Sequence, residues 1–204
     1  MIAIIDYGHG NLKSVKKALA LLGFESRITD SIKDIDNASS LIFPGVGAFG
    51  DCVQNLHDKG LAEAIKKSIK NGKPFLGICL GLQILFESSE ESPGVKGLSI
   101  FQGHISKMNF NENKLKVPHM GWNQVKFNFD HPLLSGIESG SYFYFVHSYY
   151  ADPEHQSTVL GSSTYGIQFC SAVASNNIMA VQFHPEKSHD IGFKLLERFV
   201  KEVD

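Results

Sequence analysis

Apolar residues in the first part of the chain form continuous runs that alternate with helically spaced stripes. Residues 2–5, 41–43 and 75–78 are uninterrupted apolar runs. Between them, apolar side chains recur at helical spacing in residues 12–22 and 61–69. Buried strands separated by helices predict an α/β fold with a mostly parallel central sheet flanked by helices.

The pattern changes after about residue 87. Short strand-like segments occur at residues 100–108, 114–117, 124–129, 142–150 and 158–160. No helical stripe separates them, which predicts additional antiparallel strands. Residues 178–183 return to a buried strand, and a final helix is expected behind Ser188 as N-cap, with its apolar stripe at Ile191, Leu195, Phe199 and Val203. No linker or repeat divides the chain, so we expect one domain over residues 1–204.

Composition narrows the function classes. The chain has 19 basic and 21 acidic residues, a formal net charge of -2, which gives no electrostatic basis for binding nucleic acid or an anionic membrane. Its three cysteines form neither a disulfide framework nor a CxxC metal pattern. With no secretory leader and no membrane-length apolar stretch, we expect a cytoplasmic enzyme that acts on a small molecule.

Cys79 lies where the apolar run 75–78 gives way to residues 80–86, which we expect to form an apolar helix. Gly77 and Gly81 flank it at minus two and plus two. This spacing is typical of a nucleophile elbow, in which only small neighbours tolerate the strained backbone. We therefore expect Cys79 to be a reactive thiol at a helix N-terminus, and Cys52 and Cys170 to be inert buried thiols.

A reactive thiol needs a proton acceptor, and His184 is the best candidate because it follows the last apolar strand. Glu186 lies two residues further, on the same side of an extended segment that Pro185 would maintain, and it can orient the imidazole. Reactive groups gather at the carboxyl ends of strands in α/β sheets. We expect Cys79 and His184 to meet if their strands are neighbours.

Attack on an amide places negative charge on the carbonyl oxygen, which requires nearby donors. The backbone N–H of Leu80, next to the nucleophile, is one predicted donor. Gly45 or Val46 could supply a second, because the segment 44–47 also follows a strand and its two glycines permit unusual dihedral angles.

These motifs together resemble those of class I (triad) glutamine amidotransferases, which have a flavodoxin-like fold. The elbow at residues 77–83 and the residues His184, Pro185 and Glu186 carry this resemblance. Five further segments resemble the glutaminase subunits of imidazole glycerol phosphate synthases; they are residues 6–12, 44–49, 118–123, 144–149 and 182–188.

The resemblance implies hydrolysis of L-glutamine to glutamate and ammonia, without a metal or cofactor. Ammonia would pass to a separate (β/α)8-barrel cyclase subunit, the partner in a heterodimer, which forms imidazole glycerol phosphate and AICAR in histidine biosynthesis. Cys79 would form a thioester, His184 would transfer the proton, and Glu186 would orient His184.

The resemblance also implies a role for residues around the triad. The predicted substrate-binding residues are Gly47, Gln83, Ser148 and Tyr149. The predicted partner-facing residues are Asn11, Met120, Trp122, Asn123, Tyr144 and Lys187.

Two alternatives stay open at this point. A paralogous glutaminase subunit with the same chemistry could feed an amidating enzyme of surface-sugar biosynthesis. A protein of a different class, either a noncatalytic interaction subunit or a stand-alone cysteine hydrolase, could share the elbow alone.

Overall fold

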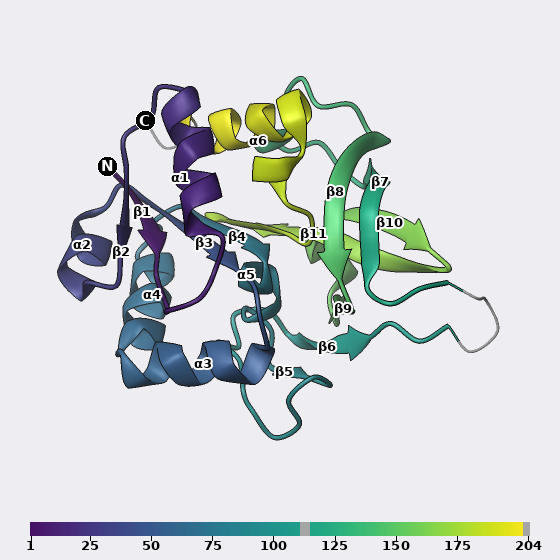
Figure 1. The fold of residues 1–204 in the computed structure, drawn as a ribbon, viewed down its shortest axis with the longest axis horizontal. Helices are drawn as coiled ribbons and strands as arrows, with labels where there is room; N and C mark the ends of the chain where they lie inside the picture. The colour runs from purple at the N-terminus through teal and green to yellow at the C-terminus, as the bar shows by residue number, and fades with distance from the viewer. Residues whose placement is uncertain (111–114, 202–204) are drawn as a thin grey trace.

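The computed structural model describes residues 1–110 and 115–201, and within them twelve strands join in one sheet. The main path runs in the order β2-β1-β3-β4-β12-β11-β10-β7-β8, and β5, β6 and β9 are attached beside it (Figure 1). The strands of the first half and the end of the chain are β1 (Ile2–Ile5), β2 (Ser26–Thr29), β3 (Ser40–Gly45), β4 (Phe75–Cys79) and β12 (Ile178–Val181). The helices are α1 (Leu12–Leu21), α2 (Ile32–Asn37), α3 (Phe49–Asp58), α4 (Leu61–Lys70), α5 (Leu80–Gln83) and α6 (His189–Lys201).

The five strands from β2 to β12 pair in parallel. Four of them, β1, β3, β4 and β12, are buried along their whole length. Their order corresponds to 2-1-3-4-5 among parallel strands, which is that of flavodoxin-like sheets. This arrangement confirms the predicted fold class.

Helices cover both faces of this parallel sheet (Figure 1). Along β1, Ala3 and Ile5 pack into the cluster that contains the buried residues of α3 and α4. Ile2 and Ile4 point the other way, into the cluster that contains the buried residues of α1 and α6. The strand's two-residue period therefore supplies both hydrophobic layers. None of the described helices is long and apolar enough to cross a membrane.

The second half contains the predicted antiparallel strands with different bounds. They are β6 (Gly103–Lys107), β7 (His119–Phe127), β8 (Ser141–His147), β9 (Tyr149–Pro153) and β10 (Val159–Tyr165). Two strands were not predicted: β11 (Ile167–Ser175), which is antiparallel to β10, and β5 (Ser88–Ser89), which pairs in parallel with β6. The predicted strand 142–150 is two strands, since the sheet breaks at Ser148. Residues 115–117 are not a strand, and Lys114 and Val203 lie outside the described residues. Residues 1–110 and 115–201 also contain three 3-10 turns: η1 (Pro132–Leu134), η2 (Gln156–Thr158) and η3 (Pro185–Lys187).

The helix expected after Cys79 is a single turn, so the prediction of a longer helix was wrong. Its continuation is prevented because the carbonyls of Ile84 and Leu85 accept hydrogen bonds from the loop at residues 98–101. A four-residue helix adds few aligned peptide dipoles. The expected activation of the thiol by a helix N-terminus therefore has no adequate basis.

The last helix begins at His189, directly after the predicted cap Ser188. The Ser188 hydroxyl has another role: it accepts the N–H of Tyr144 at 3.0 Å and donates to the carbonyl of His184 at 2.7 Å. Ser188 thus fixes the segment that carries His184 against β8.

Candidate active site

Cys79 is the last residue of β4 and has φ 56° and ψ -107°, a strained positive-φ backbone that a non-glycine residue adopts only under constraint. Its side chain is almost fully buried. The chain turns directly from β4 into α5 at this residue. The predicted elbow geometry is present at Cys79.

The two flanking glycines are required by close backbone approach. A Cβ on Gly81 would lie 2.0 Å from the carbonyl oxygen of Phe43, and a Cβ on Gly77 would lie 2.4 Å from that of Gly81. Neither glycine has a positive φ. The requirement for glycine at both positions is therefore one of space.

His184 reaches the same end of the sheet because β12 pairs in parallel with β4, with Val181 opposite Ile78. Its Nδ1 lies 2.9 Å from Glu186 Oε1, and both side chains are buried. In the described residues, His184 Nε2 has no hydrogen-bond partner. Nε2 is therefore the ring nitrogen left to exchange a proton with Cys79.

The segment between these two residues is not extended, which corrects the expected role of Pro185. Residues 185–187 form the turn η3, closed by hydrogen bonds from Lys187 N–H to the His184 carbonyl and from Ser188 N–H to that of Pro185. Proline suits the first position of such a turn because its φ is already set. The turn still brings Glu186 within hydrogen-bonding distance of His184.

Opposing effects act on the pKa of His184. Burial disfavours the charged ring, but the anionic form of Cys79 and the carboxylate of Glu186 outweigh it, and the pKa is raised to about 10. At neutral pH the ring can therefore hold the proton that the thiol loses.

A cavity of about 310 Å³ joins the predicted residues. Those that line it are Val46, Gly47, Cys79, Leu80, Gln83, Ser148, Tyr149 and His184. Gly45 is not among them: it pairs with Cys79 in the sheet, and a Cβ there would lie 2.8 Å from Leu80 Cβ. Its small size lets α5 pack against β3.

The predicted donor Val46 is already engaged. Its N–H donates to the Tyr7 hydroxyl at 3.0 Å, and that hydroxyl donates to the Val46 carbonyl at 2.6 Å. Tyr7 is buried, stacks on Phe43 at 5.2 Å, and does not line the cavity. In this conformation the Val46 N–H is therefore not offered to a substrate oxygen.

The residues predicted to face a partner separate into two groups. Met120 and Trp122 are exposed on one face of β7, and Trp122 stacks on His189 at 5.2 Å and packs edge-on against Tyr144. Lys187 Nζ lies 5.9 Å from the centre of the Tyr144 ring, and Asn11 precedes α1, which contacts η3.

Asn123 points to the opposite face of β7. Side chains alternate along a strand, so the neighbour of Trp122 cannot share its face. The Asn123 side chain instead donates to His119 and to the Thr164 carbonyl. Asn123 therefore does not share the exposed face of Trp122, and its predicted role at a partner surface stays a prediction.

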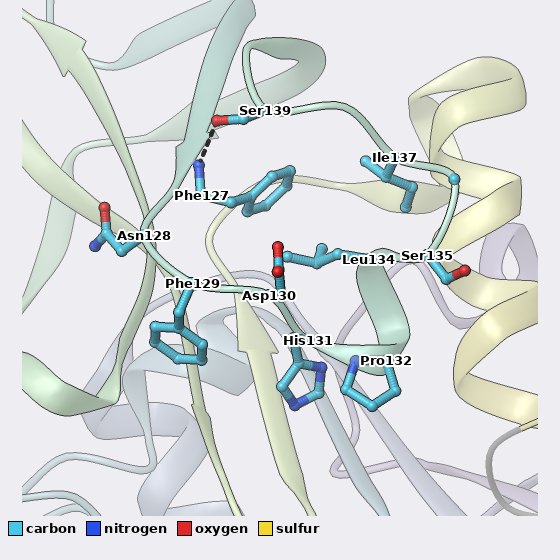
Figure 2. A pocket seen from close by; sticks show the side chains of 11 residues that line it. Phe127, Asn128, Phe129, Asp130, His131, Pro132, Leu134, Ser135, Ile137 and Ser139 are labelled. Atoms are coloured by element: carbon cyan, nitrogen blue, oxygen red, sulfur yellow. Dashed lines mark hydrogen bonds between the residues drawn. The ribbon is translucent and has the colours of Figure 1, made fainter.

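A larger cavity, of about 710 Å³, lies away from these residues, at the connection that joins β7 to β8. It is lined by the single segment 127–139, with Phe127, Leu134 and Ile137 around the Asp130 carboxylate (Figure 2). None of the predicted catalytic or substrate-binding residues lines it. The smaller cavity at Cys79 is therefore the candidate active site.

Sequence reasoning missed several residues of this site. Glu91 lines the cavity, and its Oε2 accepts the Phe49 N–H at 2.7 Å. Buried Gln182 donates from Nε2 to the Cys79 sulfur at 3.6 Å. His147 also lines the cavity. Gln182 lies two residues before His184, which was a usable signal, whereas nothing in the local pattern marks Glu91.

Comparison with known proteins defines the class of this site. The family model of glutamine amidotransferase class-I matches residues 3–203. The chain therefore belongs to the class-I glutamine amidotransferase family. Within it, the chain is similar to two proteins named imidazole glycerol phosphate synthase subunit HisH. The protein from Sulfurimonas denitrificans is 49% identical over 203 residues, and that from Syntrophotalea carbinolica is 47% identical over 203 residues; each match covers 98% of both chains.

Solved structures support the fold. A crystal structure of a glutamine amidotransferase matches with a TM-score of 0.78 at 17% identity, covering 99% of this chain and 98% of that one. PurLQS from Thermotoga maritima matches with a TM-score of 0.73 at 20% identity, covering 100% and 98%.

We expect Gly81→Ala to destabilise the protein by about 3 kcal/mol, because the added Cβ would collide with the Phe43 carbonyl. Gly94→Ala is the matched control. That position has φ 87° but open space around it, so the strain of a positive φ should cost only about 1 kcal/mol. Chemical denaturation measures both free energies of unfolding. Equal losses would contradict the requirement for space at Gly81.

Proposed function

We propose that this chain is the glutaminase subunit of an imidazole glycerol phosphate synthase. It hydrolyses L-glutamine to glutamate and ammonia through a thioester on Cys79. The ammonia passes to a (β/α)8-barrel cyclase subunit, which uses it to form imidazole glycerol phosphate and AICAR in histidine biosynthesis. The observation that carries this proposal is the strained Cys79 in one cavity with His184, whose ring is held by buried Glu186.

The chemistry follows from the free atoms of the triad. The Cys79 sulfur attacks the side-chain amide carbon of glutamine as its proton moves to His184 Nε2. Glu186 accepts the hydrogen bond from Nδ1–H and stabilises the charged ring. The proton then goes to the departing nitrogen, which leaves as ammonia. Water, deprotonated by His184, hydrolyses the thioester to glutamate and restores the thiol.

The amino acid end of glutamine fits the far side of the cavity. Glu91 supplies a carboxylate for the substrate ammonium group, and the segment Ser148 to Tyr149 borders the same space. Gly47 has φ 100°, and no atom lies within 4 Å of the position that a Cβ would take there. This space leaves room beside the substrate.

The oxyanion donors differ in availability. Leu80 follows the nucleophile and lines the cavity, so its N–H is the donor present in this conformation. The Val46 N–H becomes the second donor once it leaves the Tyr7 hydroxyl. We infer that the free subunit is slow for this reason, and that a partner carrying its ligand accelerates it.

The partner surface comprises exposed Met120 and Trp122 with Tyr144 and Lys187, and the relatives' name of subunit supports the existence of a partner. Asn11 adjoins this surface through α1. Aromatic side chains and methionine are enriched in such contacts. We propose a heterodimer in the cytoplasm, where the three unpaired cysteines would remain reduced.

Cys79→Ala should abolish glutamine-dependent synthesis by the two-subunit complex, by about 10⁴-fold or more, because the nucleophile is lost. Synthesis with added ammonium should continue, since the cyclase subunit is intact. Steady-state assays of the complex with each nitrogen source measure both rates. Cys170→Ala, another buried thiol, is the control that should keep glutamine-dependent synthesis.

Glutamine hydrolysis that survives Cys79→Ala would overturn the assignment of the nucleophile. The partner is tested separately by growth of a histidine auxotroph that lacks this subunit. An active protein that fails to restore growth would favour a paralogous surface-sugar partner.

Tyr7→Phe should raise glutamine hydrolysis by the free subunit by about 10-fold, because losing two hydrogen bonds releases the Val46 N–H. The phenyl ring keeps its stacking on Phe43. Tyr142→Phe is the control, since that side chain is exposed on β8. A slower Tyr7→Phe subunit would show that the hydroxyl supports the active conformation.

A further inference from the structure

The sulfur of Cys79 has an amide donor that the triad does not include. Gln182 directly follows β12, its side chain is fully buried, and its Nε2 lies 3.6 Å from Cys79 Sγ. Its backbone N–H is bonded to the Ser171 carbonyl, which holds the residue in the sheet. Burying a glutamine amide costs free energy unless its N–H and C=O groups are hydrogen-bonded. The hydrogen bonds of Gln182 therefore determine which of its atoms faces the sulfur.

The orientation of the Gln182 amide follows from its neighbours. The Tyr149 carbonyl can only accept, so the Gln83 atom 3.1 Å from it must be Nε2. That same Nε2 lies 3.2 Å from Gln182, where it requires an acceptor, which is Gln182 Oε1. The remaining atom, Nε2, therefore faces the sulfur as a donor.

A second set of buried side chains holds the Tyr149 carbonyl. His147 Nδ1 lies 2.8 Å from this oxygen and must donate to it, which leaves His147 Nε2 as an acceptor for His119 Nδ1 at 2.9 Å. His119 Nε2 then accepts from Asn123 Nδ2 at 3.3 Å. Each hydrogen bond sets the direction of the next.

Burial keeps the imidazole rings of His119 and His147 neutral. The pKa of His119 is lowered to about 4 and that of His147 to about 3, chiefly by desolvation. Two neutral rings preserve the donor and acceptor order at neutral pH. The two histidines therefore hold the Tyr149 carbonyl in a fixed position as the acceptor for Gln83 Nε2.

We propose that Gln182 is a further catalytic residue, whose side-chain N–H stabilises the anionic sulfur of Cys79 before attack. The inference rests on the proposed function and adds a residue to its site. A neutral amide suits this role because it cannot take the proton that His184 must carry. Gln83, His147 and His119 are positioning residues that keep the N–H turned toward the sulfur.

The test is the pH dependence of Cys79 alkylation by iodoacetamide, followed by mass spectrometry of the peptide that contains Cys79. Gln182→Met removes the donor, and Gln182→Glu removes it while keeping an oxygen opposite Gln83. We expect the alkylation midpoint to rise by about one pH unit in Gln182→Met and at least as far in Gln182→Glu. For glutamine hydrolysis, kcat should fall about 10-fold with little change in KM.

Gln168→Met is the matched control, since that glutamine is exposed on β11 and should leave the midpoint unchanged. Circular dichroism identifies variants that fold. An unchanged midpoint in either folded Gln182 variant overturns the proposal, even if hydrolysis slows. Alkylation needs neither glutamine nor a partner, so this result is separate from failure of the glutaminase assignment, which Cys79→Ala detects.

Discussion

The close approach of the Gly81 backbone to the Phe43 carbonyl is the constraint on which the active site depends. A side chain at Gly81 would meet that oxygen at 2.0 Å, so only glycine lets α5 begin directly against β3. The chain makes this sharp turn with Cys79, the last residue of β4, in a strained positive-φ backbone. Since β3, β4 and β12 are adjacent, the same sheet edge then carries the Val46 segment, the nucleophile and His184. Packing of two backbones thus determines where the chemistry occurs.

In the proposed mechanism, the reactivity of Cys79 comes from the surroundings of the thiol rather than from a helix. The helix after Cys79 has a single turn, so its dipole has little effect on the thiol. The thiol instead lies in one site with His184, which Glu186 orients, and with the side-chain amide of Gln182. The other two thiols have different surroundings: burial raises the pKa of Cys52 far above its usual range and that of Cys170 to about 12. The three buried cysteines therefore differ in the side chains that surround them.

Periodicity predicted much of the fold because buried parallel strands are continuous apolar runs, as in residues 2–5. It missed β2, which is half-exposed, and β11, whose polar residues interrupt its apolar pattern. The family and the fold are confirmed by comparison, while the roles of the triad residues stay predictions that their geometry supports. The hydrogen bond from Val46 to Tyr7 could not be predicted, because it joins residues 39 positions apart through a side-chain orientation that local patterns do not encode.

The central claim is that one thiol, in this cavity, attacks the amide carbon of glutamine. Its most direct test is covalent labelling of the wild-type protein with a glutamine analogue that carries an electrophilic carbon in place of the side-chain amide, followed by peptide mass spectrometry. We expect one adduct per chain, on Cys79, with excess glutamine protecting it and with Cys52 and Cys170 unmodified. An adduct on another cysteine, or labelling of Cys79 that glutamine does not slow, would contradict it.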